Sequence, residues 1–127
     1  RVAEWTDARG VDVILELVGG AYVPADVRAA APLARIILIG TIAGTSPTLP
    51  LHLVMAKRLT IRGTVLRARS VHEKIAATSA FAADVIPMLA SGVVRPVIDR
   101  VYPLAEIRMA HERMESNASF GKIVLEH

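Results

Sequence analysis

Short hydrophobic runs divide the chain, and glycine or proline follows most of them. The clearest run, residues 11–18, ends at Gly19 and Gly20. An apolar run of this length beside glycine predicts a strand that is buried on both faces. Comparable runs predict four more strands, at residues 34–39, 59–65, 97–101 and 122–125. Gly63 interrupts the third strand of the chain, which predicts a bulge or a close backbone approach at that position.

Helix-forming segments alternate with these strands. Residues 2–7 read as the end of a helix, residues 21–31 as a short helix with Pro24 in its first turn, and residues 51–56 as one or two helical turns. Residues 42–50 are rich in proline, glycine and serine and predict a loop.

Two longer helices are expected in the second half of the chain. Ser70 and Glu73 have the spacing of a capping box, so a helix should begin there and run to about residue 91. Pro87 should kink this helix, and Gly92 should end it. Residues 104–115 predict an amphipathic helix that buries Ile107, Ala110 and Met114 and stops at a left-handed Asn117.

The alternation of strands and helices predicts an α/β fold with a parallel sheet. The last strand-helix-strand unit differs, because its strands are short and the composition changes at residues 92–96. We therefore place a boundary there, which divides the chain into residues 1–94 and 95–127. In an open parallel sheet, ligands bind beyond the carboxyl ends of the strands. The Gly19-Gly20 pair is thus either a ligand-facing turn or an ordinary strand-to-helix turn.

Composition narrows the class of protein. The chain has 127 residues, 53% of them hydrophobic but only 4% aromatic, which predicts a globular domain with an aliphatic core. No apolar stretch approaches the roughly 18 residues of a membrane span, and no secretory signal opens the chain. The absence of cysteine excludes disulfides and thiolate metal sites within the chain. These features favour a soluble, cytoplasmic protein.

The charge pattern argues against nucleic acid as a partner. The net charge is +3 and the pI is about 9.8, but the basic residues are scattered. Their densest cluster, Arg62, Arg67 and Arg69, is small and is not interleaved with aromatic residues that could stack on bases. Arg67 and Arg69 could instead reach a cofactor phosphate or a substrate oxygen, or could simply be solvated.

Candidate catalytic chemistry is sparse. The histidines show no metal-ligand spacing, so no metal is expected in this chain. No serine, histidine and carboxylate form a defensible triad, and the catalytic residues stay unassigned. The chain begins with Arg1 in place of methionine, which suggests a piece of a longer protein, and residues 125–127 resemble the junction to a purification tag.

Short motifs follow one another along the chain, at residues 10–15, 18–20, 57–64, 66–70, 95–104, 110–115 and 121–125. Taken in this order, they resemble the medium-chain dehydrogenase/reductase superfamily, and within it the NADPH:quinone oxidoreductase branch. One departure is Glu16, where the family often has aspartate. The phosphate-binding pattern G-x-G-x-x-G is absent from this chain.

The resemblance implies a partial Rossmann fold, that is, a doubly wound parallel sheet, with a C-terminal strand-helix-strand extension. Residues 1–94 would be the second half of a dinucleotide-binding domain, and residues 95–127 would return toward a catalytic domain. The pyrophosphate site would lie outside the chain, so the chain alone should be inactive. The resemblance further implies a homodimer that pairs through the strand at 59–65.

By the same resemblance, three strand ends would contact NADPH, with NADH as an alternative. The residues near the ribose and nicotinamide would be Val18, Gly19, Gly20, Ile39, Gly40 and Thr41. The residues that offer backbone groups to the carboxamide would be Thr64, Val65 and Leu66, followed by Arg67. The implied activity is hydride transfer from NADPH to a quinone or a similar electron-poor carbonyl or enone.

Three rival functions remain open from the sequence. A zinc-dependent alcohol dehydrogenase or an enoyl reductase of the same superfamily would differ in residues upstream of this chain. A non-catalytic α/β binding module for an acidic partner would account for the high pI and would bind in a salt-sensitive way. A structural protein that keeps the nucleotide fold would bind a cofactor without turnover.

Overall fold

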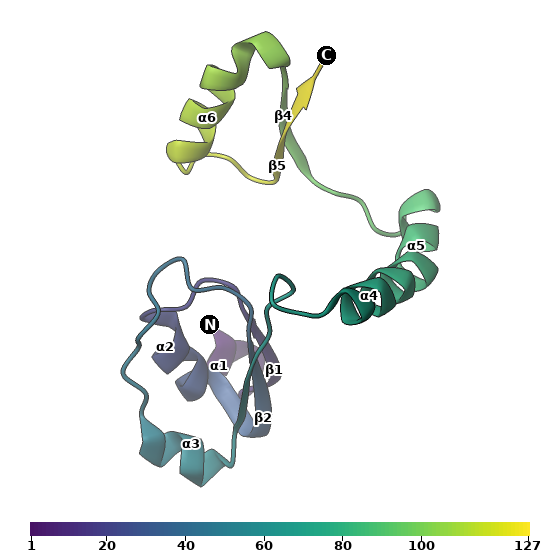
Figure 1. The fold of residues 1–127 in the computed structure, drawn as a ribbon. Helices are drawn as coiled ribbons and strands as arrows, with labels where there is room; N and C mark the ends of the chain where they lie inside the picture. Colours follow the sequence, from purple (N-terminus) through teal and green to yellow (C-terminus); the bar gives the residue numbers. More distant parts are fainter. The chain divides into compact units, whose positions relative to one another are not determined.

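The computed structural model describes residues 1–127 and divides into two compact units, Arg1–Arg69 and Ser70–His127. Figure 1 shows the elements of each unit along the chain. No helix of the chain combines the length and the apolar character that crossing a membrane requires. The predicted boundary between residues 94 and 95 and the predicted tag junction at 125–127 stay predictions.

Unit 1 is a parallel three-stranded sheet in the order β1-β2-β3, with short helices between the strands. Its elements are α1 (Val2–Trp5), β1 (Val11–Glu16), α2 (Tyr22–Ala29), β2 (Ala30–Leu38), α3 (Leu51–Lys57) and β3 (Thr60–Gly63). The predicted alternation of strands and helices, and the loop before α3, are confirmed.

The core of unit 1 lies on one face of the sheet. Val27 of α2 and Ile36 of β2 are fully buried, and the small residues Ala30, Ala31 and Ala34 let the helix approach the strand closely. Helices α2 and α3 contact each other and both contact β2, so they cover the same face. This single-sided core explains why the apolar sequence of β1 is only partly buried.

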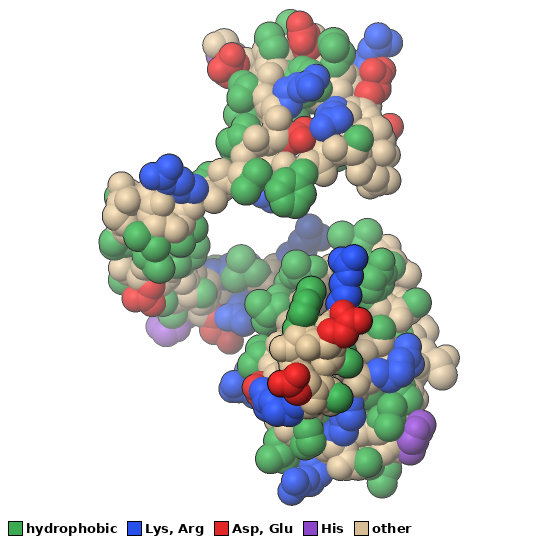
Figure 2. All heavy atoms as spheres, turned by 180° about the vertical axis from the view of Figure 1, so that it is seen from behind, with side chains coloured by type: hydrophobic (Ala, Val, Ile, Leu, Met, Phe, Trp, Pro, Cys, Tyr) green, Lys and Arg blue, Asp and Glu red, His purple; other side chains and the backbone are tan.

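The prediction that β1 is buried on both faces is wrong for this chain. Val13 is 47% exposed and Leu15 is 63% exposed, whereas Glu16 is buried. Side chains alternate across a strand, so Val13 and Leu15 lie on the face away from the helices. Figure 2 shows hydrophobic side chains gathered at the surface. The apolar run therefore gives β1 a second apolar face, and no element of unit 1 covers that face.

Lys57 ties α3 to the end of α2. Its Nζ donates hydrogen bonds to the carbonyl oxygens of Val27 at 3.0 Å, Arg28 at 2.8 Å and Ala30 at 2.7 Å. The last carbonyls of a helix lack partners within the helix, and a cation is favourable there because of the helix dipole. This contact holds the two helices at the amino-end side of the sheet.

Gly63 is the last residue of β3 and not an interruption within it. The pairing of β3 with β2 is regular from Thr60 to Gly63, so the predicted bulge is wrong. No backbone lies close to Gly63 in the direction of a side chain either, since a Cβ built there would meet nothing within 4 Å. The strand ends at Gly63, before the end of the apolar run. Val65 and Leu66, which follow it, are more than half exposed.

Unit 2 contains two consecutive helices and a strand-helix-strand unit. Its elements are α4 (Val71–Asp84), α5 (Ile86–Ala90), β4 (Ile98–Pro103), the 3-10 turn η1 (Leu104–Glu106), α6 (Ile107–Glu115) and β5 (Lys122–Glu126). The capping box of Ser70 and Glu73 is present. The predicted kink lies at Val85, which keeps right-handed helical φ and ψ angles between α4 and α5, and Pro87 falls in the first turn of α5. Gly92 and Asn117 have the expected left-handed backbone.

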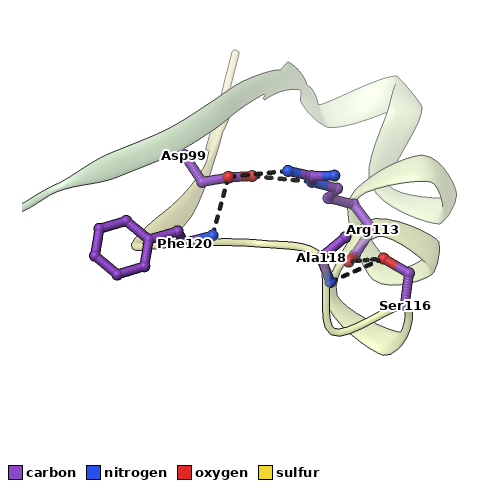
Figure 3. Close-up of polar contacts among 5 residues, drawn as sticks. All are labelled: Asp99, Arg113, Ser116, Ala118 and Phe120. Carbon is purple, nitrogen blue, oxygen red and sulfur yellow. Dashed lines mark hydrogen bonds and ion pairs between the residues drawn. The ribbon is translucent and has the colours of Figure 1, made fainter.

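An ion pair joins β4 to α6 in unit 2 (Figure 3). The Arg113 guanidinium donates to both carboxylate oxygens of Asp99 at 3.0 Å, and the Phe120 amide donates to Asp99 as well. The Arg113 contact, followed by the Phe120 amide, lowers the pKa of Asp99 to about 2. One carboxylate thus holds the strand, the helix and the loop that leads into β5.

The predicted buried face of α6 is only partly correct. Ala110 is buried, but Ile107 is 44% exposed and Met114 is 54% exposed. Both line an open apolar groove beside Ile123 and Leu125 of β5. Two parallel strands are too narrow a platform to cover the whole apolar stripe of the helix.

Candidate functional site

The three strands of unit 1 end in one row. Glu16 at the end of β1 pairs in register with Leu38 of β2, and Leu38 pairs with Gly63 of β3. The segments that follow these residues therefore begin side by side along the carboxyl edge of the sheet. These are the segments in which the sequence placed its candidate cofactor contacts, and this edge is where open parallel sheets bind ligands.

The turn after β1 depends on its two glycines. Gly19 has φ of +75° and Gly20 has φ of +55°, in the left-handed region that favours glycine. A Cβ on Gly19 would stand 2.8 Å from the Cα of Thr41, and a Cβ on Gly20 would collide with the carbonyl of Ala43. The glycines thus permit close contact between the turn and the loop that follows β2.

Hydrogen bonds join this turn to the loop at residues 39–44. The amide of Gly20 donates to the carbonyl of Gly44 at 2.9 Å, and the amide of Ala43 donates to the carbonyl of Val18 at 2.8 Å. Two strand ends are therefore connected by main-chain contacts that do not depend on the identity of exposed side chains.

The ends of β2 and β3 border an open hollow of about 350 Å³. Its lining residues are Leu38, Ile39, Gly40, Thr41, Gly63, Thr64 and Val65. Five of the predicted contact residues, Ile39, Gly40, Thr41, Thr64 and Val65, are thus brought together. The hollow combines three apolar side chains, those of Leu38, Ile39 and Val65, with two glycines that leave main-chain atoms accessible.

The remaining predicted residues do not line this hollow. Val18, Gly19 and Gly20 form the neighbouring turn, whereas Leu66 and Arg67 follow the end of β3. Arg69 contacts the end of β3, because its Nη2 donates to Thr64 Oγ1 at 2.8 Å. Arg69 thus fixes the hydroxyl of a residue that lines the hollow.

An acidic pair, the buried Glu16 and the half-buried Asp26, lies beneath the glycine turn. Glu16 is 6% exposed, and its Oε1 accepts hydrogen bonds from the amides of Val18 and Gly19, the latter at 2.6 Å. The main-chain oxygen of Glu16 accepts from the amides of Ile39 and Gly40. The Glu16 side chain also interacts with the carboxyl group of Asp26 of α2.

The two carboxyl groups of this pair are shifted in opposite directions. The Gly19 amide is the main influence that lowers the pKa of Glu16. Burial, then the hydrogen bond and the charge of Glu16, raise the pKa of Asp26 to about 7. A carboxyl group must carry a proton to donate to another carboxylate, so Asp26 is the protonated partner.

Sequence reasoning missed the part that this pair plays. From the sequence, Glu16 stands out only as a departure from a family pattern, and nothing marks Asp26. A usable signal existed, because a charged residue at the end of an apolar strand and next to two glycines requires buried hydrogen-bond donors. Asp26 carried no comparable signal, since only the packing of α2 brings it to Glu16.

The histidines take no part in this edge. His52, His72 and His111 are exposed, and the last of them borders the apolar groove of unit 2. No group of three or more histidine, aspartate or glutamate side chains is arranged to hold a metal ion.

A parallel sheet whose carboxyl edge carries a glycine turn and an adjoining hollow is the arrangement of a Rossmann-like dinucleotide-binding domain. Comparison with known proteins leads to the same class of domain. The model of the zinc-binding dehydrogenase family matches residues 1–125. The chain belongs to this family, within the medium-chain dehydrogenase/reductase superfamily, whose members are oxidoreductases.

Three relatives illustrate the likeness. A quinone oxidoreductase of Lama guanicoe is 30% identical over 118 residues, which are 92% of this chain and 34% of the relative. A mycobacterial protein solved in complex with NADPH is 25% identical, with a TM-score of 0.76 over 100% of this chain and 39% of that one. An NAD-dependent alcohol dehydrogenase is 25% identical, with a TM-score of 0.72 over 99% of this chain and 34% of that one.

The chain spans about a third of the length of the curated relatives that it matches. Its residues therefore correspond to only a part of each of those proteins.

Proposed function

We propose that the carboxyl edge of unit 1 binds the nicotinamide end of NADPH, and that the protein to which it belongs reduces a quinone or a similar electron-poor carbonyl compound. The observation that carries this proposal is the convergence of three strand ends on one hollow lined by residues 38–41 and 63–65. The likeness to a quinone oxidoreductase and to an NADPH complex supports the choice of substrate and cofactor.

The residues of the hollow fit a flat ring with one polar substituent. Gly63 has open space where a Cβ would stand, so a ring can lie against the main chain there. Ile39 and Val65 offer apolar surface, and the main-chain groups next to Thr64 offer partners for a carboxamide. When bound, NADPH supplies the hydride, and the protein supplies placement and exclusion of water.

Each predicted segment has a separate task in this proposal. Val18, Gly19 and Gly20 would contact the ribose, and Gly40 and Thr41 would border the ribose and the ring. Thr64, with its hydroxyl held by Arg69 at 2.8 Å, would present its backbone to the carboxamide together with Val65 and Leu66. Arg67 would lie at the margin, where a substrate oxygen could reach it.

The alternative within the superfamily is a zinc-dependent alcohol dehydrogenase or an enoyl reductase. The likeness to an NAD-dependent alcohol dehydrogenase favours it, and that likeness also makes NADH the alternative cofactor. The absence of cysteine from this chain is compatible with a cytoplasmic protein under either alternative.

Binding can be tested on the chain itself by saturation-transfer NMR with NADPH and NADH. We expect the nicotinamide protons to receive more saturation than the adenine protons, because the hollow would contact only the nicotinamide end. Strong adenine signals with no nicotinamide signal would contradict the placement. Salt-sensitive binding of nucleic acid without any dinucleotide signal would favour the binding module instead.

Turnover can be tested on the longer protein that contains this chain. NADPH oxidation would be followed with a para-quinone and with simple aldehydes, with and without a metal chelator. The proposal predicts quinone-dependent turnover that the chelator does not affect. Aldehyde-dependent turnover that the chelator abolishes would assign the protein to the alcohol dehydrogenases, and binding without any turnover would indicate a structural role.

A further inference from the structure

The glycine turn of the proposed site is held from below by one side chain. Glu16 Oε1 accepts from the Val18 and Gly19 amides, and the Glu16 main-chain oxygen accepts from Ile39 at 2.8 Å and from Gly40 at 3.3 Å. One residue thus anchors two of the three strand ends. A carboxylate that accepts several amides is a strong and directional anchor, because charge-assisted hydrogen bonds are about twice as strong as neutral ones.

Asp26 sits behind this anchor, next to the Glu16 carboxylate. Its Oδ2 is buried without a hydrogen-bond partner among the other groups of the chain. A protonated carboxyl group can tolerate this position, because it is neutral and donates its proton to Glu16. If Asp26 loses the proton, two carboxylates face each other in a poorly solvated space, and one of them must move.

No cation compensates for that second charge. No ion pair involves Glu16 or Asp26. The turn and the loop at residues 39–50 that packs on it contain no charged residue. On α2, Arg28 lies beside Lys57 and Gly10 at the opposite end of the sheet. Asp12 of β1 pairs with Arg9, and Arg35 of β2 lies level with Val13 and not with Glu16.

We propose that Glu16 and protonated Asp26 form a positioning pair that sets the Val18-Gly19-Gly20 turn for the cofactor, and that loss of the shared proton loosens the turn. This inference rests on the proposed function of the edge as a nicotinamide site. Dinucleotide affinity should then fall as the pH rises through neutrality, although neither carboxyl group contacts the cofactor.

The turn itself reports on the pair without any cofactor. In the 127-residue chain, we expect the amide protons of Val18 and Gly19 to shift together in a pH titration by NMR, with a midpoint near the Asp26 pKa of about 7. Asp26→Asn keeps the shape of the side chain and a hydrogen-bond donor but cannot ionise. In this variant, the amide protons of Val18 and Gly19 should therefore show no step near pH 7. Asp12→Asn, an exposed change on the same strand, should leave the step intact.

Cofactor affinity provides the second measurement. NADP⁺ affinity of the chain should weaken on the order of five-fold or more between pH 6 and pH 8.5 relative to that of Asp26→Asn. The ratio of the two affinities at each pH cancels the effect of the titrating nucleotide phosphates, because both proteins bind the same nucleotide. Glu16→Gln should weaken binding at every pH and should shift the Val18 and Gly19 amide protons upfield.

The outcomes separate the two proposals. An amide step that is absent in the wild type, or that persists in Asp26→Asn, would overturn the positioning pair whatever the cofactor does. Identical pH profiles of affinity in the wild type and Asp26→Asn would overturn its effect on binding. A normal amide step in a chain that binds no dinucleotide at any pH would instead overturn the proposed function and leave the pair as a device that holds the turn.

Discussion

At the scale of single residues, the glycines of the site have opposite reasons for being glycine. Gly20 is required by the fold, because its φ is +55° and a Cβ would collide with Ala43. Gly63 is not required by the fold, because a Cβ there would meet no atom within 4 Å. The missing side chain at Gly63 therefore keeps space open in the hollow.

This contrast predicts that Gly63→Ala and Gly20→Ala behave differently. Gly63→Ala should leave the free energy of unfolding within about 0.5 kcal/mol of the wild type but should weaken NADPH binding about ten-fold, because the methyl group fills the hollow. Gly20→Ala should lower the free energy of unfolding by about 2 kcal/mol, through the backbone strain and the collision. Denaturant unfolding and NADPH titration of both variants check this. If Gly63→Ala and the wild type bind NADPH with equal affinity, the nicotinamide ring does not bind in this hollow.

At the scale of elements, unit 2 relies on local devices more than on burial. Only Tyr102 and Ala110 are buried hydrophobic residues in it. The capping box of α4 and the Asp99–Arg113 ion pair therefore carry a larger share of its stability than such contacts usually do.

The ion pair predicts a loss of stability in acid. The folded pKa of Asp99 is about 2, below the ordinary value of 3.8, so its contribution is present above pH 4 and is lost as the pH falls toward 2. Arg113→Met should lower the melting temperature of unit 2 by about 4–8 °C at pH 7 and should flatten its dependence on pH below 4. Arg108→Met, on the exposed pair with Glu112 in the same helix, should change the melting temperature little.

The capping box predicts a smaller effect on α4. Ser70→Ala removes the acceptor of the Glu73 amide and should cost about 1 kcal/mol in the stability of the helix. Ser79→Ala, at an exposed position in the middle of α4, should be neutral or slightly stabilising, because alanine has the higher helix propensity. Far-UV circular dichroism during thermal unfolding distinguishes them, and equal losses in both variants would contradict a capping role.

At the scale of the whole molecule, the sheet of unit 1 has two open edges. The strand order makes β1 one edge strand and β3 the other. Open edges pair with further strands, so we propose that β3 pairs with β3 of a second copy to form a homodimer.

Light scattering over a range of concentrations tests the dimer. The wild type should approach twice the monomer mass, and Thr60→Lys on β3 should shift it toward the monomer, because a lysine on an edge strand opposes pairing. Thr78→Lys on the exposed surface of α4 adds the same charge and should have no effect. A monodisperse monomer at every concentration would overturn the proposal.

Much of the fold could be predicted from local pattern, and the errors in predicted burial share one cause. The five strands, the capping box, the stop at Gly92 and the left-handed Asn117 follow from short-range chemistry, and the structure confirms them. The burial of β1 and of Ile107 and Met114 was predicted wrongly. An apolar pattern states that a face is to be covered, but it does not say whether the covering layer belongs to the same chain.

The sequence by itself determined the order of the elements, the parallel sheet and the segments that the candidate site would use, because periodicity, capping and glycine turns act over a few residues. Only the tertiary structure decided that residues 39–41 and 64–65 share one hollow, and that Arg69 binds Thr64. It also decided that Asp26 meets Glu16 beneath the glycine turn. These contacts join residues from different elements, and their chemistry depends on burial, which a linear pattern of side chains does not specify.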